Sequence, residues 1–156
     1  MRWSELDLPR RTWLIPGERT KNARPHLVML SGQMVEIIES RTRDNGRDFV
    51  FGAGKGAFSG WSRSKDRLDR RCKLAAPWAV HDLRRSFVTH LNEFGIAPSV
   101  IEAIVNHASG VKAGVAGTYD RSKHLPERAR VMQLWADHLT AEPTDNVVDF
   151  APAAAR

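Results

Sequence analysis

The 156-residue sequence contains a single cysteine, Cys72, which excludes an internal disulfide and any zinc site built from cysteines. Its six histidines form no His-Glu-x-x-His or Cys-His cluster, so we expect no structural metal. No apolar run approaches the roughly 20 residues that span a membrane, and Met1 begins no signal-peptide pattern. Together these absences predict a cytoplasmic protein with no membrane partner.

The charge is unevenly distributed. Lys and Arg number 24 against 18 Asp and Glu, for a net charge of +6. Residues 141–156 hold three acids and one arginine, a net −2, so residues 1–140 carry +8. A hydrophobic fraction of 42% in a chain of one-domain length indicates an ordinary globular protein, and the basic body favours polyanionic partners.

The apolar pattern predicts mainly helices with a small antiparallel sheet, an α+β fold. Two β-prone runs, 12–15 and 26–30, flank a connection with turn-forming Pro and Gly, which predicts a hairpin. Helical spacing and capping residues predict five helices. A Gly-rich connector that leads into a short helix bearing Tyr119, and a C-terminal tail, complete the chain. The predicted helices span 31–43, 61–73, 81–94, 98–106 and 126–140, the connector 108–117 and the tail 141–156.

Two stretches have more than one interpretation. The helix predicted at 61–73 carries six Lys or Arg, which form either a solvated face or a surface that contacts a polyanion. The Gly-rich segment 52–56 lacks the Gly-Lys-Ser/Thr ending of a phosphate-binding loop, so a plain loop is the better interpretation.

Three residue types point to chemistry at a phosphate. His81 and Arg84 lie three apart on a predicted helix, where both can donate to one oxyanion. Tyr119 is the sole tyrosine, and basic residues precede and follow it. A phenol becomes a useful nucleophile only where cations surround it.

These residues belong to runs that resemble the catalytic domain of the tyrosine recombinases, the phage-integrase family. The runs are HDLRRSFVTHL, LNEFGIAPSVIEAIVNHASG and GTYDRS, which match the family's His-x-x-Arg box, later Asn-His position and C-terminal Tyr. IPGERTKNARPHLVMLS resembles the family's lysine-bearing hairpin and makes Lys21 its lysine. The resemblance implies a catalytic domain over residues 1–140, followed by the tail.

The resemblance also implies a mechanism without metal or nucleotide cofactor. Tyr119 would form a 3′-phosphotyrosine, Arg84 and His107 would hold the non-bridging oxygens, His81 would assist proton transfer, and Lys21 would protonate the 5′-oxygen. The partners would be double-stranded DNA and further recombinase protomers. The basic residues expected to contact the DNA are Arg24, Arg85 and Arg121.

One family feature is missing from the sequence. A further catalytic arginine, in a helix ending Leu-x-Trp-x-Asp/Glu, would fall before Met1, because Arg2-Trp3-Ser4-Glu5-Leu6-Asp7 matches only the end of that pattern. We therefore expect a chain that lacks the N-terminal part of the domain and has little activity. The alternatives are a non-catalytic DNA-binding remnant and an enzyme like the type IB topoisomerases.

Overall fold

A computed structural model describes residues 1–43, 46–53, 56–73, 76–107 and 124–141. The N-terminal part forms a three-stranded antiparallel sheet in the order β1-β2-β3, with β1 at Leu6–Asp7, β2 at Thr12–Ile15 and β3 at His26–Met29. Thr12 pairs with Met29 and Ile15 with His26, so the predicted hairpin is confirmed and β1 adds a short edge strand. Two 3-10 turns, η1 (Trp3–Glu5) and η2 (Gly17–Arg19), precede β1 and follow β2.

Helices are the main secondary structure of the described chain, as predicted: α1 (Gly32–Glu39), α2 (Trp61–Cys72), α3 (Val80–Glu93), α4 (Pro98–Ile104) and α6 (Leu125–Thr140). Ser31 caps α1 by accepting a hydrogen bond from the Met34 amide, and Pro98 occupies the first turn of α4. α1 ends before the predicted boundary near Arg43. There, Ser40 Oγ and Arg41 Nε both donate to the Ile37 carbonyl, which caps the last turn.

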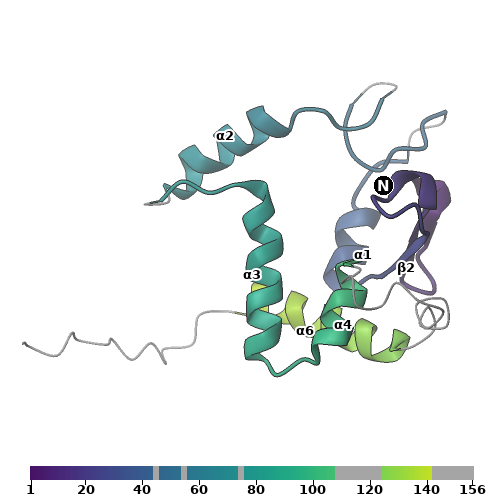
Figure 1. The fold of residues 1–156 in the computed structure, drawn as a ribbon. Coiled ribbons are helices and arrows are strands. Elements are labelled where there is room, and N and C mark those ends of the chain that lie inside the picture. The colour runs from purple at the N-terminus through teal and green to yellow at the C-terminus, as the bar shows by residue number, and fades with distance from the viewer. Residues whose placement is uncertain (44–45, 54–55, 74–75, 108–123, 142–156) are drawn as a thin grey trace, which may run out of the picture.

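The apolar side chains form two clusters. One joins the sheet to α1 through Leu30, Ile38 and Val50, and the other joins α3, α4 and α6 around Leu91, Val100 and Val131. α6 connects them, crossing behind α3 and α4 toward α1 (Figure 1).

Polar contacts fix α6 against α1. The Gln133 side chain accepts a hydrogen bond from the Gly32 amide at 2.9 Å and donates one to Gln33 Oε1 at 2.9 Å. Gln33 in turn donates to Asp137 at 2.8 Å. These bonds join segments about a hundred residues apart in sequence.

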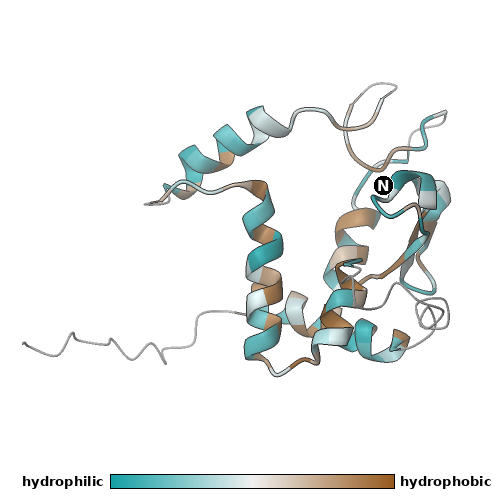
Figure 2. Cartoon of the chain, in the orientation of Figure 1, coloured by the Kyte–Doolittle hydropathy of each residue, from teal (hydrophilic) through white to brown (hydrophobic). Residues whose placement is uncertain are grey.

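α2 and the first turns of α3 stand away from this body (Figure 1). The spacing of Leu83 with Phe87 and Leu91 predicts one buried stripe, yet Leu83 is 60% exposed while Leu91 is fully buried. No described element covers the first turns of α3, which explains the difference. α2 is largely hydrophilic (Figure 2) and is held by Trp78, whose Nε1 donates to Asp69 at 2.7 Å.

Candidate active site

Arg84 lies in the N-terminal half of α3, where its side chain is exposed. The Asp82 carboxylate begins this helix by accepting a hydrogen bond from the Ala79 amide at 2.8 Å. That bond, reinforced by Arg85, lowers the pKa of Asp82 from its ordinary value. Gly95 ends the helix in the left-handed conformation, with φ +73°. Both ends of α3 are therefore fixed by local contacts, which sets the position of Arg84 along the helix.

α4 ends in a cap that positions His107. Asn106 adopts the left-handed conformation, with φ +53°, and the His107 amide donates to the Glu102 carbonyl at 3.0 Å. This is the Schellman arrangement, in which asparagine is one of the few residues that tolerates the required backbone. The backbone itself therefore directs His107 out of the helix.

Arg84 and His107 line the same hollow, which has a volume of about 330 Å³. Ile101 and Val88, which line it, belong to the α3–α4 core, and Glu102 places a carboxylate in the same lining. An arginine and a histidine at one opening provide several hydrogen-bond donors for a phosphate. The lining residues are Arg84, Val88, Asn92, Pro98, Ile101, Glu102, Val105 and His107.

The connection that carries Lys21 is fastened to this end of α4. Asn22 Nδ2 donates to Asn106 Oδ1 at 3.0 Å, and Asn106 directly precedes His107. Within the connection, Thr20 Oγ1 donates to the carbonyls of Gly17 and Arg24 at 2.9 and 2.7 Å. A side chain at Gly17 would bring its Cβ to 2.8 Å from the Ala23 carbonyl oxygen, so the tight turn requires glycine. Lys21 itself is exposed.

Two further residues hold the hairpin and were not identified from the sequence. His26 Nε2 lies 3.1 Å from the Ile104 carbonyl oxygen, and the buried Arg128 of α6 donates to the Leu27 carbonyl. Burial lowers the pKa of His26 from its ordinary value, and the charges of Arg128 and Arg84 act in the same direction. No sequence motif marked either residue, because each acts on a segment far away in the chain.

The remaining predicted site residues lie apart from the hollow or outside the described ranges. His81 is exposed one turn before Arg84 and does not line the hollow. Arg85 pairs with Asp82 at 3.0 Å, and Arg24 lies exposed in the hairpin connection. Tyr119 and Arg121 are outside the described residues.

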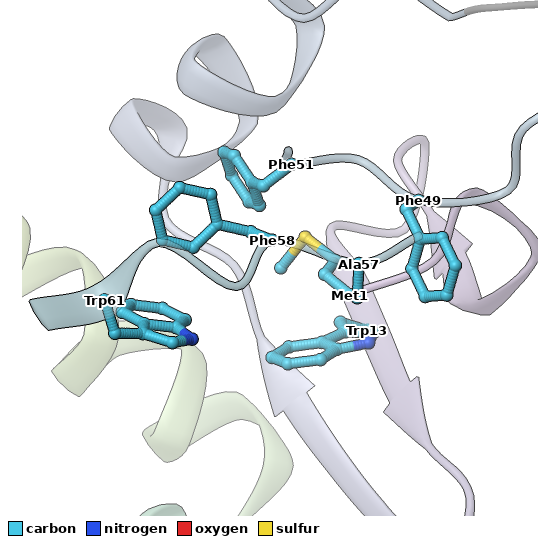
Figure 3. A pocket seen from close by; sticks show the side chains of 7 residues that line it. All are labelled: Met1, Trp13, Phe49, Phe51, Ala57, Phe58 and Trp61. Carbon is cyan, nitrogen blue, oxygen red and sulfur yellow. The ribbon is translucent and has the colours of Figure 1, made fainter. Parts of the chain in front are cut away.

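A second hollow, of about 600 Å³, lies between the sheet and the start of α2 (Figure 3). It contains none of the predicted site residues, and its walls are apolar: Met1, Trp13, Phe49, Phe51, Ala57, Phe58 and Trp61. In the described ranges no group of three or more His, Cys, Asp or Glu is placed to hold a metal ion. Every helix described there is too short or too polar to cross a bilayer.

The model of the phage integrase family matches residues 1–120. The chain belongs to this family. The resemblance found in the sequence motifs is thereby confirmed, and the small sheet with surrounding helices agrees with the fold that it implied. No solved structure gives a significant match to this chain.

Several curated integrases are similar to this family member. Prophage integrase IntA of Escherichia coli (strain K12) is 35% identical over 149 residues, which cover 94% of this chain and 36% of IntA. Prophage integrase IntZ of the same strain is 33% identical, over 87% of this chain and 34% of IntZ. The integrase of Shigella phage Sf6 is 28% identical, over 89% of this chain and 36% of its own length. The chain thus spans about a third of the length of these relatives.

Proposed function

We propose that this chain carries the DNA-cleaving site of a site-specific recombinase that works through a 3′-phosphotyrosine. The observation that carries the proposal is the hollow shared by Arg84 and His107, with the Lys21 connection fastened beside it. Family membership and the integrase relatives support the same reaction class. The proposed catalytic unit is residues 1–140.

In the proposed reaction, the hydroxyl oxygen of Tyr119 attacks the phosphorus of a DNA phosphodiester and loses its proton. A bond forms between phosphorus and the tyrosyl oxygen, and the bond from phosphorus to the 5′-oxygen breaks. The 5′-oxygen leaves with a proton, so one ester replaces another and the step can reverse onto a second strand. Arg84 and His107 stabilise the negative charge that grows on the non-bridging oxygens.

Proton delivery is assigned to Lys21, with His81 assisting. An alkoxide is a poor leaving group, so a positioned acid accelerates its departure by about 10² to 10⁴. The Asn22–Asn106 bond supports the role of Lys21, because it holds the adjacent residue against the end of α4. The location of His81 outside the hollow favours a supporting role over a direct contact with the reacting phosphate.

Double-stranded DNA is the proposed substrate, and further protomers are its proposed companions on that DNA. Residues 1–140 carry a net charge of +8, and α2 presents an exposed basic surface. Phosphate contacts by such side chains supply most of the affinity of non-specific DNA binding. The basic residues assigned to the DNA backbone nearer the site are Arg24, Arg85 and Arg121.

The test is covalent trapping on a pool of labelled nicked duplexes of random sequence. In such a duplex the short 5′-terminated product diffuses away, so the protein remains attached to the label. We expect an adduct that survives denaturation from the unmodified chain and none from Tyr119→Phe, which keeps the ring and removes the nucleophilic oxygen.

The outcomes separate the competing functions. An adduct that persists in Tyr119→Phe would place the nucleophile elsewhere. DNA binding without any adduct would identify a non-catalytic binding protein. Multiple-turnover relaxation of supercoiled plasmid would favour an enzyme like the type IB topoisomerases.

A further inference from the structure

The hairpin that carries Lys21 and the helix end that carries His107 are separate pieces of chain, and the proposed reaction needs both at one phosphate. Among the described residues, two hydrogen bonds join them. Asn22 reaches Asn106 at 3.0 Å, and His26 reaches the carbonyl of Ile104 at 3.1 Å. One contact reaches Asn106, the αL residue that directs His107 outward, and the other reaches the carbonyl two residues before it, so both hold the hairpin connection to this end of α4.

The His26 contact has a defined chemistry. A carbonyl oxygen only accepts hydrogen bonds, so Nε2 of His26 must carry the hydrogen and act as donor. The Ile104 carbonyl belongs to the last turn of α4, where such groups lack a helical partner. His26 is the first residue of β3, the strand that follows the Lys21 connection. Its hydrogen bond therefore supplies a partner for a carbonyl at the end of α4, the helix that leads to His107.

β3 is also held by α6. Arg128 of α6 is 6% exposed and donates to the carbonyl of Leu27, the residue after His26. Its Nε finds no hydrogen-bond partner among the described residues. α6 thus holds β3 in place while the ring of His26 reaches toward α4.

We propose that His26 is a positioning residue that locks the Lys21 hairpin to the His107 end of α4, an assignment that rests on the proposed function. It does so as a single hydrogen-bond donor between β3 and the Ile104 carbonyl. The role needs no contact with DNA. This role predicts that removing the His26 hydrogen-bond donor displaces Lys21, the proposed general acid, while the chain still folds.

The physical arm of the test measures amide hydrogen exchange in the full chain. We compare His26→Leu, which removes the donor, with His26→Gln, whose amide N–H can reach the same carbonyl. Loss of one hydrogen bond should speed exchange of the Thr20, Ala23 and His107 amides by about five- to tenfold in the Leu variant. His26→Gln should restore the slow exchange.

A control separates the lock from general destabilisation. Val28→Ala weakens the packing of the same strand without touching the His26 bond. It should raise exchange only in proportion to its loss of global stability. Equal and uniform exchange in His26→Leu and Val28→Ala, after correction for stability, would overturn the lock.

The chemical arm uses a nicked duplex that the unmodified chain cleaves, prepared also with a bridging sulfur in place of the 5′-oxygen. A thiolate leaves without an acid, so the sulfur substrate bypasses Lys21. With the oxygen substrate, His26→Leu should slow adduct formation by about tenfold or more, as expected for a misplaced general acid. With the sulfur substrate its rate should approach that of the unmodified chain.

Each result bears on a different claim. Equal losses on both substrates would mean that His26 supports the fold and does not position the acid, which overturns the proposal. If the unmodified chain forms no Tyr119-dependent adduct on either substrate, the proposed function fails. The exchange arm then still decides whether His26 joins the two segments.

Discussion

Hydrogen bonds from single side chains to distant segments of the chain define the geometry of the candidate site. His26 is the most informative, because its ring lies near two arginines from other elements, Arg128 on α6 and Arg84 on α3. Burial is the main reason that a positive charge on this ring is penalised and its pKa lowered, and the two arginines add to the effect. The folded protein therefore keeps His26 neutral at a pH where the unfolded chain would already bind a proton.

This arrangement predicts a pH dependence of stability. The His26 pKa is lower in the folded protein than the value of 6.5 for an unperturbed histidine. Its contribution to the free energy of unfolding is therefore complete above pH 6.5 and is lost as the pH falls through the folded pKa. Urea unfolding at a series of pH values should show this decline, and His26→Gln should flatten it. The same slope in both proteins would assign the effect to other groups.

Titration of the carboxylates with shifted pKa values falls outside the pH range in which His26 affects the free energy of unfolding. Hydrogen bonds lower the pKa values of Asp48, Asp69 and Asp137 from 3.8, so their contributions are lost at more acidic pH. The pH series can therefore cover the histidine range and end above the pH at which these carboxylates titrate.

Among the elements, α3 combines two environments along one helix. Leu91 is fully buried in the helical core, and Leu83, two turns earlier, is 60% exposed. Leu91→Ala should lower the free energy of unfolding by about 2–5 kcal/mol through lost contacts and a residual cavity. Leu83→Ala is the same substitution on the same helix and should change it by less than about 0.5 kcal/mol.

Chemical denaturation of both variants checks the difference. A large loss in Leu83→Ala would mean that something covers the start of α3 in solution. Comparable small losses in both variants would contradict the helical core described around Leu91.

The same helix illustrates what the sequence could predict. Its end at Gly95, the hairpin turn and the cap at Ser31 follow from residues a few positions apart, so local rules located them. The exposure of Leu83 could not be predicted, because an apolar spacing indicates a face and does not reveal whether anything packs on it. His26 and Arg128 were missed for a related reason, since their partners lie 78 and 101 residues away.

For the site, the family motifs selected Arg84 and His107, and both residues line one hollow. The motifs could not show how the Lys21 hairpin is fastened there. That depends on Asn22 and Asn106, two uncharged residues without a chemical role of their own. The catalytic and DNA-binding roles of all the predicted site residues stay predictions, and Tyr119 and Arg121 lie outside the described residues.

At the scale of the whole molecule, the basic surface predicts salt-sensitive binding to duplex DNA. The logarithm of the binding constant falls against the logarithm of salt concentration by about 0.9 for each phosphate neutralised. We expect Arg63→Gln combined with Arg67→Gln on α2 to reduce this slope by up to about 1.8, twice that per-phosphate value. Fluorescence anisotropy with a labelled duplex at several salt concentrations measures it.

A control with the same change in net charge distinguishes the loss of DNA contacts on α2 from the lower net charge of the protein. Arg10→Gln with Arg130→Gln also lowers the net charge from +6 to +4. Those two arginines already pair with Asp7 and Glu127, whereas neither Arg63 nor Arg67 pairs with a described carboxylate. If both double variants reduce the salt slope of the binding constant equally, α2 is not part of the DNA-binding surface.

The position of α6 across both apolar clusters has a consequence for the order of assembly. β3 and α1 leave the ribosome about a hundred residues before the helix that holds them, as the Gly32–Gln133 and Leu27–Arg128 bonds show. Closing so long a loop is slow compared with forming a hairpin or a helix. A nascent chain that ends before α6 therefore lacks the clamp on β3, and with it a fixed distance between Lys21 and His107. The candidate site would therefore take its final geometry only after α6 has been synthesised.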